Sequence, residues 1–140
     1  MSYRNLEVWQ LAKQVSVDIH TMTLTDLPKF ELFEAGGQLR RSGKSVRSNI
    51  VEEYGRKKYQ HEFYKHLIYA LGSNDETIDH QETLFETGSL KNKELIDQLS
   101  QQLQLLGKKL NLLIQSIELG IRTNKLAASG KKPVAQSVDL

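Results

Sequence analysis

The sequence predicts an all-α fold, a bundle of four helices spanning residues 1–126. Only two prolines occur, Pro28 and Pro133, so long stretches are free of the residue that breaks helices. In these stretches apolar residues recur at spacings of three and four, which places them on one face of a helix. The chain of 140 residues is long enough to bury its own core. It contains no cysteine, which excludes disulfides and thiolate metal sites.

The first predicted helix covers residues 5–23 and the second covers residues 33–54. Proline disfavours helical conformation in the residue before it, so the first helix should end shortly before Pro28. In the second helix Gly36 and Gly43 lie seven residues apart on the inward face, where missing side chains would let another helix approach closely. The inward stripe of the first helix is Leu6, Trp9, Ala12, Val15, Ile19 and Met22.

The third and fourth predicted helices cover residues 59–86 and 93–126. The inward stripe of the third contains Asn74 and Gln81, so buried amides are expected there. Gly88 is well placed to end the third helix, because glycine adopts the left-handed backbone conformation that often follows a helix. The fourth helix has a heptad seam made of Leu99, Leu103, Leu106, Leu110, Leu113 and Ile117.

The apolar surface of the fourth helix is wider than a single subunit needs. Further leucines and isoleucines beside the heptad seam widen the apolar arc to more than half of the circumference. A peripheral helix usually needs a stripe only somewhat over about 100° wide. A second copy is the simplest cover, so the sequence predicts a homo-oligomer. The predicted interface residues are Leu105, Leu112, Ile114 and Leu119.

Composition and the chain ends exclude several classes of protein. No apolar stretch approaches the roughly 20 residues that cross a bilayer. The start of the chain lacks a basic region followed by an apolar run, so no signal peptide is expected. We therefore expect a cytoplasmic protein. Residues 127–140 combine Ser, Gly, Lys and Pro without periodicity, which predicts a disordered tail.

One segment resembles a phosphate-binding loop but lacks its pattern. That loop requires G-x-x-x-x-G-K-[ST] after a β-strand. Gly43, Lys44 and Ser45 fit the end of the motif, but its first glycine would have to stand at position 38, which is Gln38. The preceding residues also have helical spacing. The segment therefore does not predict nucleotide binding.

The histidines and polar residues do not predict a catalytic or metal site. His61 and His66 are five residues apart, so they cannot share a metal from one face of a helix. Glu76 and His80 are four apart, which is typical of a surface contact between adjacent turns. No serine, histidine and acid arrangement stands out. We expect no enzyme activity, metal or cofactor, and we interpret Asn49 with Glu53 as a buried hydrogen-bonded pair.

One segment carries a strong excess of positive charge in a chain whose net charge is +2. Residues 38–66 contain eight Lys or Arg and three acidic residues, hence +5, whereas residues 67–106 contain two and seven, hence −5. Arg40, Lys44 and Arg47 follow at spacings of four and three, which predicts a basic stripe opposite the apolar face. The predicted nucleic-acid-binding residues are Arg40, Arg41, Lys44, Arg47, Arg56, Lys57 and Lys58.

Two tyrosines, Tyr54 and Tyr59, bracket the basic segment 56–58. Aromatic side chains stack on bases in proteins that bind single strands, so these tyrosines are candidates for such contacts. A solvated helix face followed by a polar turn explains the same residues equally well for a single copy. Repetition of the stripe in an oligomer favours the nucleic-acid interpretation, because phosphate contacts add.

Five phrases of the sequence follow one another in the order and with the spacings of a known family. They are residues 3–12 (YRNLEVWQLA), 38–41 (QLRR), 45–52 (SVRSNIVE), 62–67 (EFYKHL) and 70–73 (ALGS). In these phrases the chain resembles the four-helix-bundle family of 23S rRNA intervening-sequence proteins. The resemblance covers about residues 3–120. It implies an antiparallel up-and-down bundle that assembles into a homopentameric ring.

The resemblance also bears on function. No enzymatic activity is attached to the family, and accessory proteins of diversity-generating retroelements, which resemble it in fold, bind nucleic acid through a basic surface. Two of the positions at which this chain departs from the family pattern lie in the predicted stripe. Lys44 stands where a small residue is usual and Arg47 where a proline is usual. Both departures add positive charge to the predicted stripe.

The sequence thus leads to two hypotheses. The first is a non-enzymatic homo-oligomer whose basic stripe binds RNA or DNA backbone with little sequence preference. The alternative is a protein–protein scaffold in which the basic block contacts the acidic block of a neighbouring subunit. In that case Arg40 and Arg41 would pair with Asp79, Glu82 or Glu86 across the interface.

Overall fold

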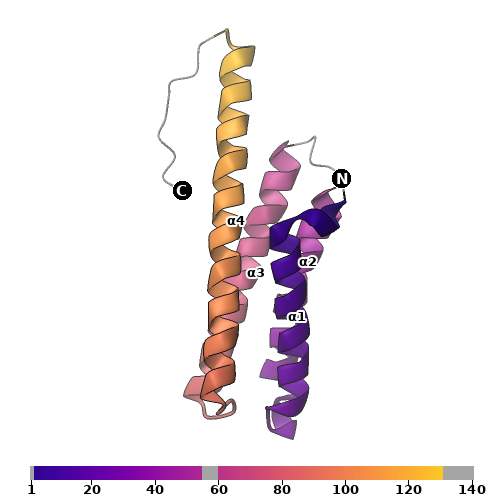
Figure 1. The fold of residues 1–140 in the computed structure, drawn as a ribbon, viewed down its shortest axis with the longest axis vertical. Helices are drawn as coiled ribbons and strands as arrows, with labels where there is room; N and C mark the ends of the chain where they lie inside the picture. The colour runs from indigo at the N-terminus through magenta and orange to yellow at the C-terminus, as the bar shows by residue number, and fades with distance from the viewer. Residues whose placement is uncertain (1, 55–59, 131–140) are drawn as a thin grey trace.

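Four long helices make up most of the protein in the computed structural model (Figure 1). The structure describes residues 2–54 and 60–130. These ranges contain no strand, and none of their helices is long and apolar enough to cross a membrane. The prediction of an all-α, four-helix protein is confirmed. In chain order the elements are η1 (Tyr3–Asn5), α1 (Glu7–Thr25), η2 (Lys29–Glu31), α2 (Ala35–Tyr54), α3 (Gln60–Glu86) and α4 (Lys93–Ala128), where η denotes a short 3-10 helix.

The four long helices enclose a common core. Helix α1 packs against α2 and α4, and α3 packs against the same two helices. The buried apolar side chains form two clusters along the bundle. One includes Trp9, Leu67 and Leu110, and the other includes Ile19 and Leu99. The stripe predicted for α1 faces this core, which confirms the helical periodicity read from the sequence.

Local signals set the helix ends. The side chain of Asn92 accepts a hydrogen bond from the backbone N–H of Leu95 at 3.2 Å and so caps the start of α4. Gly88 has a φ of 81°, the left-handed conformation expected where α3 stops. Helix α1 starts at Glu7, two residues later than predicted, because the residues before it form η1. The Ser2 hydroxyl caps η1 by accepting a hydrogen bond from the backbone N–H of Arg4 at 3.2 Å.

The two predicted buried amides tie α3 to α4. Asn74 and Gln81 are both buried. The Nδ2 group of Asn74 donates to the carbonyl oxygen of Leu103 at 2.9 Å, and the Nε2 group of Gln81 donates to the Ser100 hydroxyl at 2.8 Å. A buried amide without such partners would destabilise the fold, so these bonds fix which turns of α3 and α4 lie opposite each other.

Two glycines of α2 lie where another part of the chain approaches closely. A Cβ atom at Gly43 would lie 3.3 Å from Cδ1 of Ile19, so the predicted close approach of another helix is confirmed there. At Gly36 the close neighbour is different, because a Cβ atom would lie 2.5 Å from the carbonyl oxygen of Glu31, at the end of η2. Glycine is therefore required at position 36 by the preceding turn of the chain. The predicted reason, close packing of another long helix, does not apply there.

Helix α4 is the longest helix and extends past the other three (Figure 1). The first four residues of its heptad seam are fully buried, whereas the last two, Leu113 and Ile117, are half-buried. The helix continues to Ala128, two residues beyond the predicted end of the bundle. Most of the predicted disordered tail, residues 131–140, lies outside the described residues.

Candidate nucleic-acid interface

The predicted basic stripe on α2 divides into two groups. Arg41 and Lys44 are exposed, and no hydrogen bond or ion pair engages either side chain within the described ranges. Arg40 and Arg47 are half-buried and reach toward α1. The three remaining predicted residues, Arg56, Lys57 and Lys58, lie outside the described residues. The helix therefore presents fewer free cations than its sequence alone indicates.

Arg40 holds the corner between α1 and α2. Its Nη1 group donates to the Thr23 hydroxyl at 2.8 Å, and its Nη2 group donates to the carbonyl oxygen of Leu32 at 2.6 Å. The expectation that Arg40 lies on an open face is corrected. The chain segment around η2 crosses the side of α2 and supplies an acceptor there, which a helical wheel does not reveal.

Arg47 lies over an aromatic ring of α1. Its guanidinium carbon is 5.5 Å from the centroid of the Trp9 ring, and its Nη1 group donates to the Ser16 hydroxyl at 3.3 Å. The ammonium group of Lys13 is also 5.5 Å from the Trp9 centroid. The ring of Tyr3 meets Trp9 edge to face, with centroids 5.2 Å apart. Helices η1, α1 and α2 thus bring aromatic and basic side chains together.

The contribution of Lys13 was missed in the sequence. It lies outside the charged block 38–66, and only the packing of α1 on α2 brings it near Arg47. One signal was present, since Trp9 and Lys13 are four residues apart and therefore neighbours on one helical face.

A shallow depression marks the surface of α2 beside this cluster. Its volume is about 480 Å³, and it is lined by Lys44, Arg47, Ser48, Val51 and Glu52. Two cations and a hydroxyl suit an anionic ligand, whereas the Glu52 carboxylate opposes one. The depression lies on one helix and has no convergent acid and base groups of the kind that hydrolytic chemistry requires.

Tyr54 does not provide the stacking surface that the sequence suggested. The side chain is buried and packs edge-on against Phe63, with ring centroids 6.3 Å apart. A base cannot reach a ring that is covered in this way, so the expectation for Tyr54 is wrong. Tyr59 lies outside the described residues.

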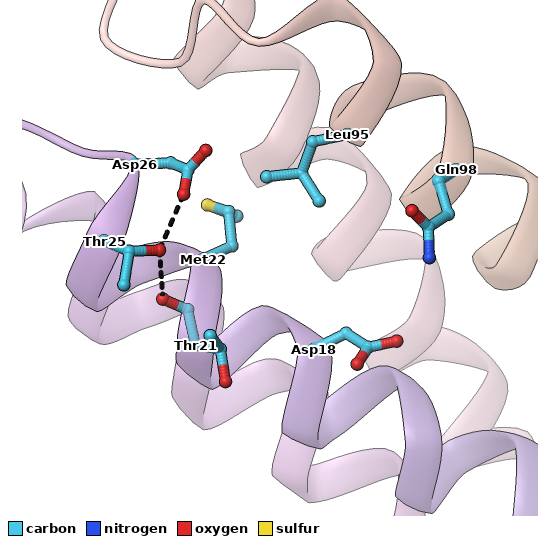
Figure 2. Close-up of a pocket in the computed structure, with 7 residues that line it drawn as sticks. All are labelled: Asp18, Thr21, Met22, Thr25, Asp26, Leu95 and Gln98. Atoms are coloured by element: carbon cyan, nitrogen blue, oxygen red, sulfur yellow. Dashed lines mark hydrogen bonds between the residues drawn. The ribbon is translucent and has the colours of Figure 1, made fainter.

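A second pocket lies between α1 and α4, and Figure 2 shows its lining (about 190 Å³). Two carboxylates, Asp18 and Asp26, face this pocket, and both already accept hydrogen bonds. Asp18 accepts from the side chains of Gln14 and Gln102, at 2.9 and 3.0 Å. The carboxylate of Asp26 lies 2.6 Å from the Thr25 hydroxyl. Negative charge in the pocket makes it unsuitable for phosphate.

The histidines make ordinary contacts. His80 Nε2 lies 3.2 Å from Glu76 Oε1 one turn away, which confirms the predicted contact. Asn49 accepts from Nδ1 of His66 at 3.1 Å, because its own Nδ2 group donates to the Ser45 carbonyl at 2.9 Å. The side chain of Glu53, the predicted partner of Asn49, lies outside the described residues. Within the described ranges no three acidic or histidine side chains could hold a metal ion.

The predicted oligomer interface on α4 is partly exposed. Leu105 and Leu119 are 43% and 37% exposed, and Leu112 is half-buried. Ile114 is different, because it is only 5% exposed and packs in the core cluster around Trp9. The subunit itself covers Ile114, which corrects its placement on an outer face.

Two further exposed apolar side chains are aromatic and lie in the connection between α1 and α2. Phe33 is 88% exposed, and Phe30 on η2 is also well exposed. The sequence interpretation placed Phe33 at the start of a helix and gave it no role. Exposed apolar side chains that cluster together often mark a contact with another protein or copy.

A four-helix protein with free cations on one side of α2 is the class that this fold and surface define. The family model for 23S rRNA-intervening sequence proteins matches residues 4–112. This match covers most of the chain, so the protein belongs to that family, as the sequence resemblance predicted. No curated protein matches the chain.

Proposed function

We propose that this protein is a non-enzymatic homo-oligomer that binds RNA or DNA backbone through the basic surface of α2. The observation that carries the proposal is the pair Arg41 and Lys44. Both are exposed, and within the described ranges no carboxylate neutralises them. Free cations on a rigid helix are the groups that contact phosphates without reading bases.

The proposed assembly is a homopentameric ring of antiparallel up-and-down bundles, located in the cytoplasm. The short connections between α1 and α2 and between α3 and α4 favour antiparallel neighbours. The exposed leucines of α4, together with Phe33, provide apolar surface for contact between copies. The ring, its size and the cytoplasmic location remain predictions from the sequence.

A ring would strengthen a surface that is weak in one copy. Each subunit contributes the same cations, so a long polyanion would meet several sets of them. Affinity for DNA then falls steeply as salt rises, because each phosphate contact displaces condensed counterions. The proposal therefore predicts binding that is strongly salt-dependent and nearly independent of sequence.

Fluorescence anisotropy with a labelled RNA hairpin and a labelled DNA duplex tests binding. We expect affinity for both probes to fall by at least about tenfold between about 50 and 200 mM salt. The double variant Arg41→Gln with Lys44→Gln should weaken binding at low salt. The double variant Lys91→Gln with Lys125→Gln, with the same charge change elsewhere on the surface, is the matched control. Wild-type protein that binds neither probe at low salt would contradict the proposal.

Mass measurement in solution tests the assembly. The wild-type protein should have the mass of five subunits, and Leu105→Glu with Leu119→Glu should reduce it. The control is Gln101→Glu, which adds a charge at another exposed position of α4. A wild-type monomer would remove the repeated basic surface on which strong binding depends.

A protein–protein scaffold is the second candidate function. It is favoured by Asp79, Glu82 and Glu86, exposed carboxylates on α3 that have no ion pair within the described ranges. If Arg41 pairs with Glu82 of a neighbouring copy, Arg41→Glu should dissociate the assembly and the added change Glu82→Arg should restore it. In the nucleic-acid proposal, Arg41→Glu leaves the mass unchanged and weakens binding.

A further inference from the structure

We propose that the phosphate-binding surface continues from α2 onto α1 and η1, where Arg4, Lys13, Lys44 and Arg47 form one site for phosphodiester groups. The inference rests on the proposed function, because it assumes that the ligand is a nucleic-acid backbone. It adds two cations, Arg4 and Lys13, that lie far from the basic block in the sequence. These four residues are referred to below as the Trp9 cation site.

The Trp9 ring limits the distance between two of these cations. Lys13 and Arg47 come from different helices, yet each places its charge 5.5 Å from the centroid of this ring. The two charges therefore cannot be farther apart than twice that distance. Successive phosphates of one strand advance by about 3.4 Å along the axis of B-DNA, so a few adjacent phosphates cover such a span.

The other two cations extend the site on either side. Lys44 precedes Arg47 by three residues and therefore lies on the same face of α2. Arg4 lies over the ring of Tyr3, 5.5 Å from its centroid, and Tyr3 in turn contacts Trp9 edge to face. The site thus runs from η1 across the end of α1 to the middle of α2.

These cations remain available to a ligand. Arg4, Lys13 and Lys44 are exposed, and none of the four forms an ion pair with a carboxylate within the described ranges. Among the described residues, Arg47 donates one side-chain hydrogen bond, to the Ser16 hydroxyl, through one of its five N–H groups. Other basic residues differ, since Lys93 pairs with Asp97.

Glu7 on α1 and Glu52 on α2 are carboxylates on the same helices as these cations, and they are not equivalent. Glu7 on α1 lies 3.4 Å from the ammonium group of Lys109 on α4, which offsets its charge. Glu52 lines the depression beside Lys44 and Arg47 and is exposed. Its negative charge opposes a phosphate and marks the edge of the site.

The burial of Trp9 defines what the site recognises. The residue is only 8% exposed, so its ring is covered and cannot stack on a base. Recognition is therefore limited to the charged backbone. The Trp9 cation site should bind oligouridine and oligoadenosine of equal length with similar affinity.

The test uses the full-length protein and fluorescein-labelled oligouridine, with affinity measured over a series of salt concentrations. Lys13→Gln should weaken binding by up to about fivefold at low salt, the effect of one exposed charge pair. It should also reduce the slope of log affinity against log salt by about 0.7, the value for one lost single-strand phosphate contact. Lys91→Gln removes the same charge from the connection between α3 and α4 and should change neither quantity.

A gain of affinity provides a readout that misfolding cannot imitate. Glu52→Gln removes the opposing carboxylate and should strengthen binding by up to about fivefold at low salt. The inference is overturned if Lys13→Gln and Glu52→Gln both bind as the wild type does while Arg41→Gln with Lys44→Gln binds weakly. That result leaves the proposed function in place. Absence of any wild-type binding would overturn both.

Discussion

Arg40 on α2 and Thr23 on α1 form a hydrogen bond of 2.8 Å that joins the two helices near their connection. The Thr23 hydroxyl in turn donates to the carbonyl oxygen of His20 at 2.9 Å, so its proton is committed and its lone pair faces the guanidinium. Arg40 also donates to Leu32. A residue that resembles part of a binding stripe in the sequence therefore stabilises the corner of the bundle.

Replacement of Arg40 should destabilise the fold. Arg40→Ala removes the donor to the buried Thr23 hydroxyl and to the half-buried Leu32 carbonyl, which should lower the free energy of unfolding by about 1–3 kcal/mol. Arg41→Ala, at the adjacent exposed position, should change it by less than about 0.5 kcal/mol. Urea denaturation followed by circular dichroism measures both. Equal effects of the two substitutions would contradict the role assigned to Arg40.

The contact between Asn74 and Gly107 should appear as energetic coupling. A Cβ atom at Gly107 would lie 3.1 Å from Nδ2 of Asn74, so Gly107→Ala forces this buried amide to shift. We expect a loss of about 1–3 kcal/mol, because overpacking and disturbed buried bonds both oppose the gain in helix propensity. In the background Asn74→Ala the same change should be less harmful by at least about 0.5 kcal/mol. Denaturant unfolding of the four proteins gives this double-mutant cycle, and additive effects would refute the coupling.

Two glycines should respond to alanine with opposite signs. Gly72 is exposed within α3, and a Cβ atom there would have no neighbour within 4 Å. Gly72→Ala should therefore raise the free energy of unfolding by about 1 kcal/mol through helix propensity. Gly88→Ala should lower it by about 1–2 kcal/mol, because its φ of 81° is unfavourable for a residue with a Cβ atom. Thermal unfolding of the two variants checks both signs, and stabilisation by Gly88→Ala would be the contrary result.

Tyr64 should make stability fall at high pH. Its hydroxyl donates to Oε1 of Glu118 at 2.8 Å, and this bond, followed by desolvation and the negative charge of Glu118, raises the pKa of Tyr64 above its ordinary value of 10.0. The unfolded chain then loses the phenolic proton first. Stabilisation by this group is complete below pH 10.0 and is lost as pH rises through the raised folded pKa.

The pH dependence is measured on two variants. Tyr64→Phe should lose less stability above pH 10.0 than the wild type does. Glu118→Gln should move the pKa of Tyr64 back toward its ordinary value, since both the hydrogen bond to a carboxylate and the charge that opposes ionisation are removed. The phenolate absorbance of each protein, with Tyr64→Phe subtracted, reports the titration of this side chain. An unchanged titration in Glu118→Gln would argue against Glu118 as the cause.

The sequence predicted the helices well because their periodicity is strong. The inward residues of α1 and the buried amides Asn74 and Gln81 are set by the period of the helix itself. Ile114 shows the limit of that reasoning. Helix α4 packs against both α1 and α3, so two neighbours cover a wider arc than the stripe expected for a peripheral helix. The apolar surface of α4 that stays exposed is therefore smaller than predicted, and its main residues are Leu105 and Leu119.

The candidate site was predicted less completely, for a physical reason. A helical wheel shows the direction of a side chain but not what it reaches, and long arginine side chains extend well beyond their own helix. Arg40 therefore meets the segment around η2, while Lys13 joins Arg47 only through the packing of α1 on α2. Such relations depend on tertiary contacts between residues that are distant in the sequence.

The C-terminal end of α4 can show whether another molecule packs against it. The side chains of residues 122–125 are exposed, and the bond of 2.9 Å from Asn124 to Gln60 is the farthest side-chain hydrogen bond to another helix along the described part of α4. In an isolated subunit, helical turns with so little packing open often, and their backbone amides exchange rapidly with deuterated water. Slow exchange in these turns would indicate that a neighbouring molecule covers them, so the end of α4 can report on assembly without any label.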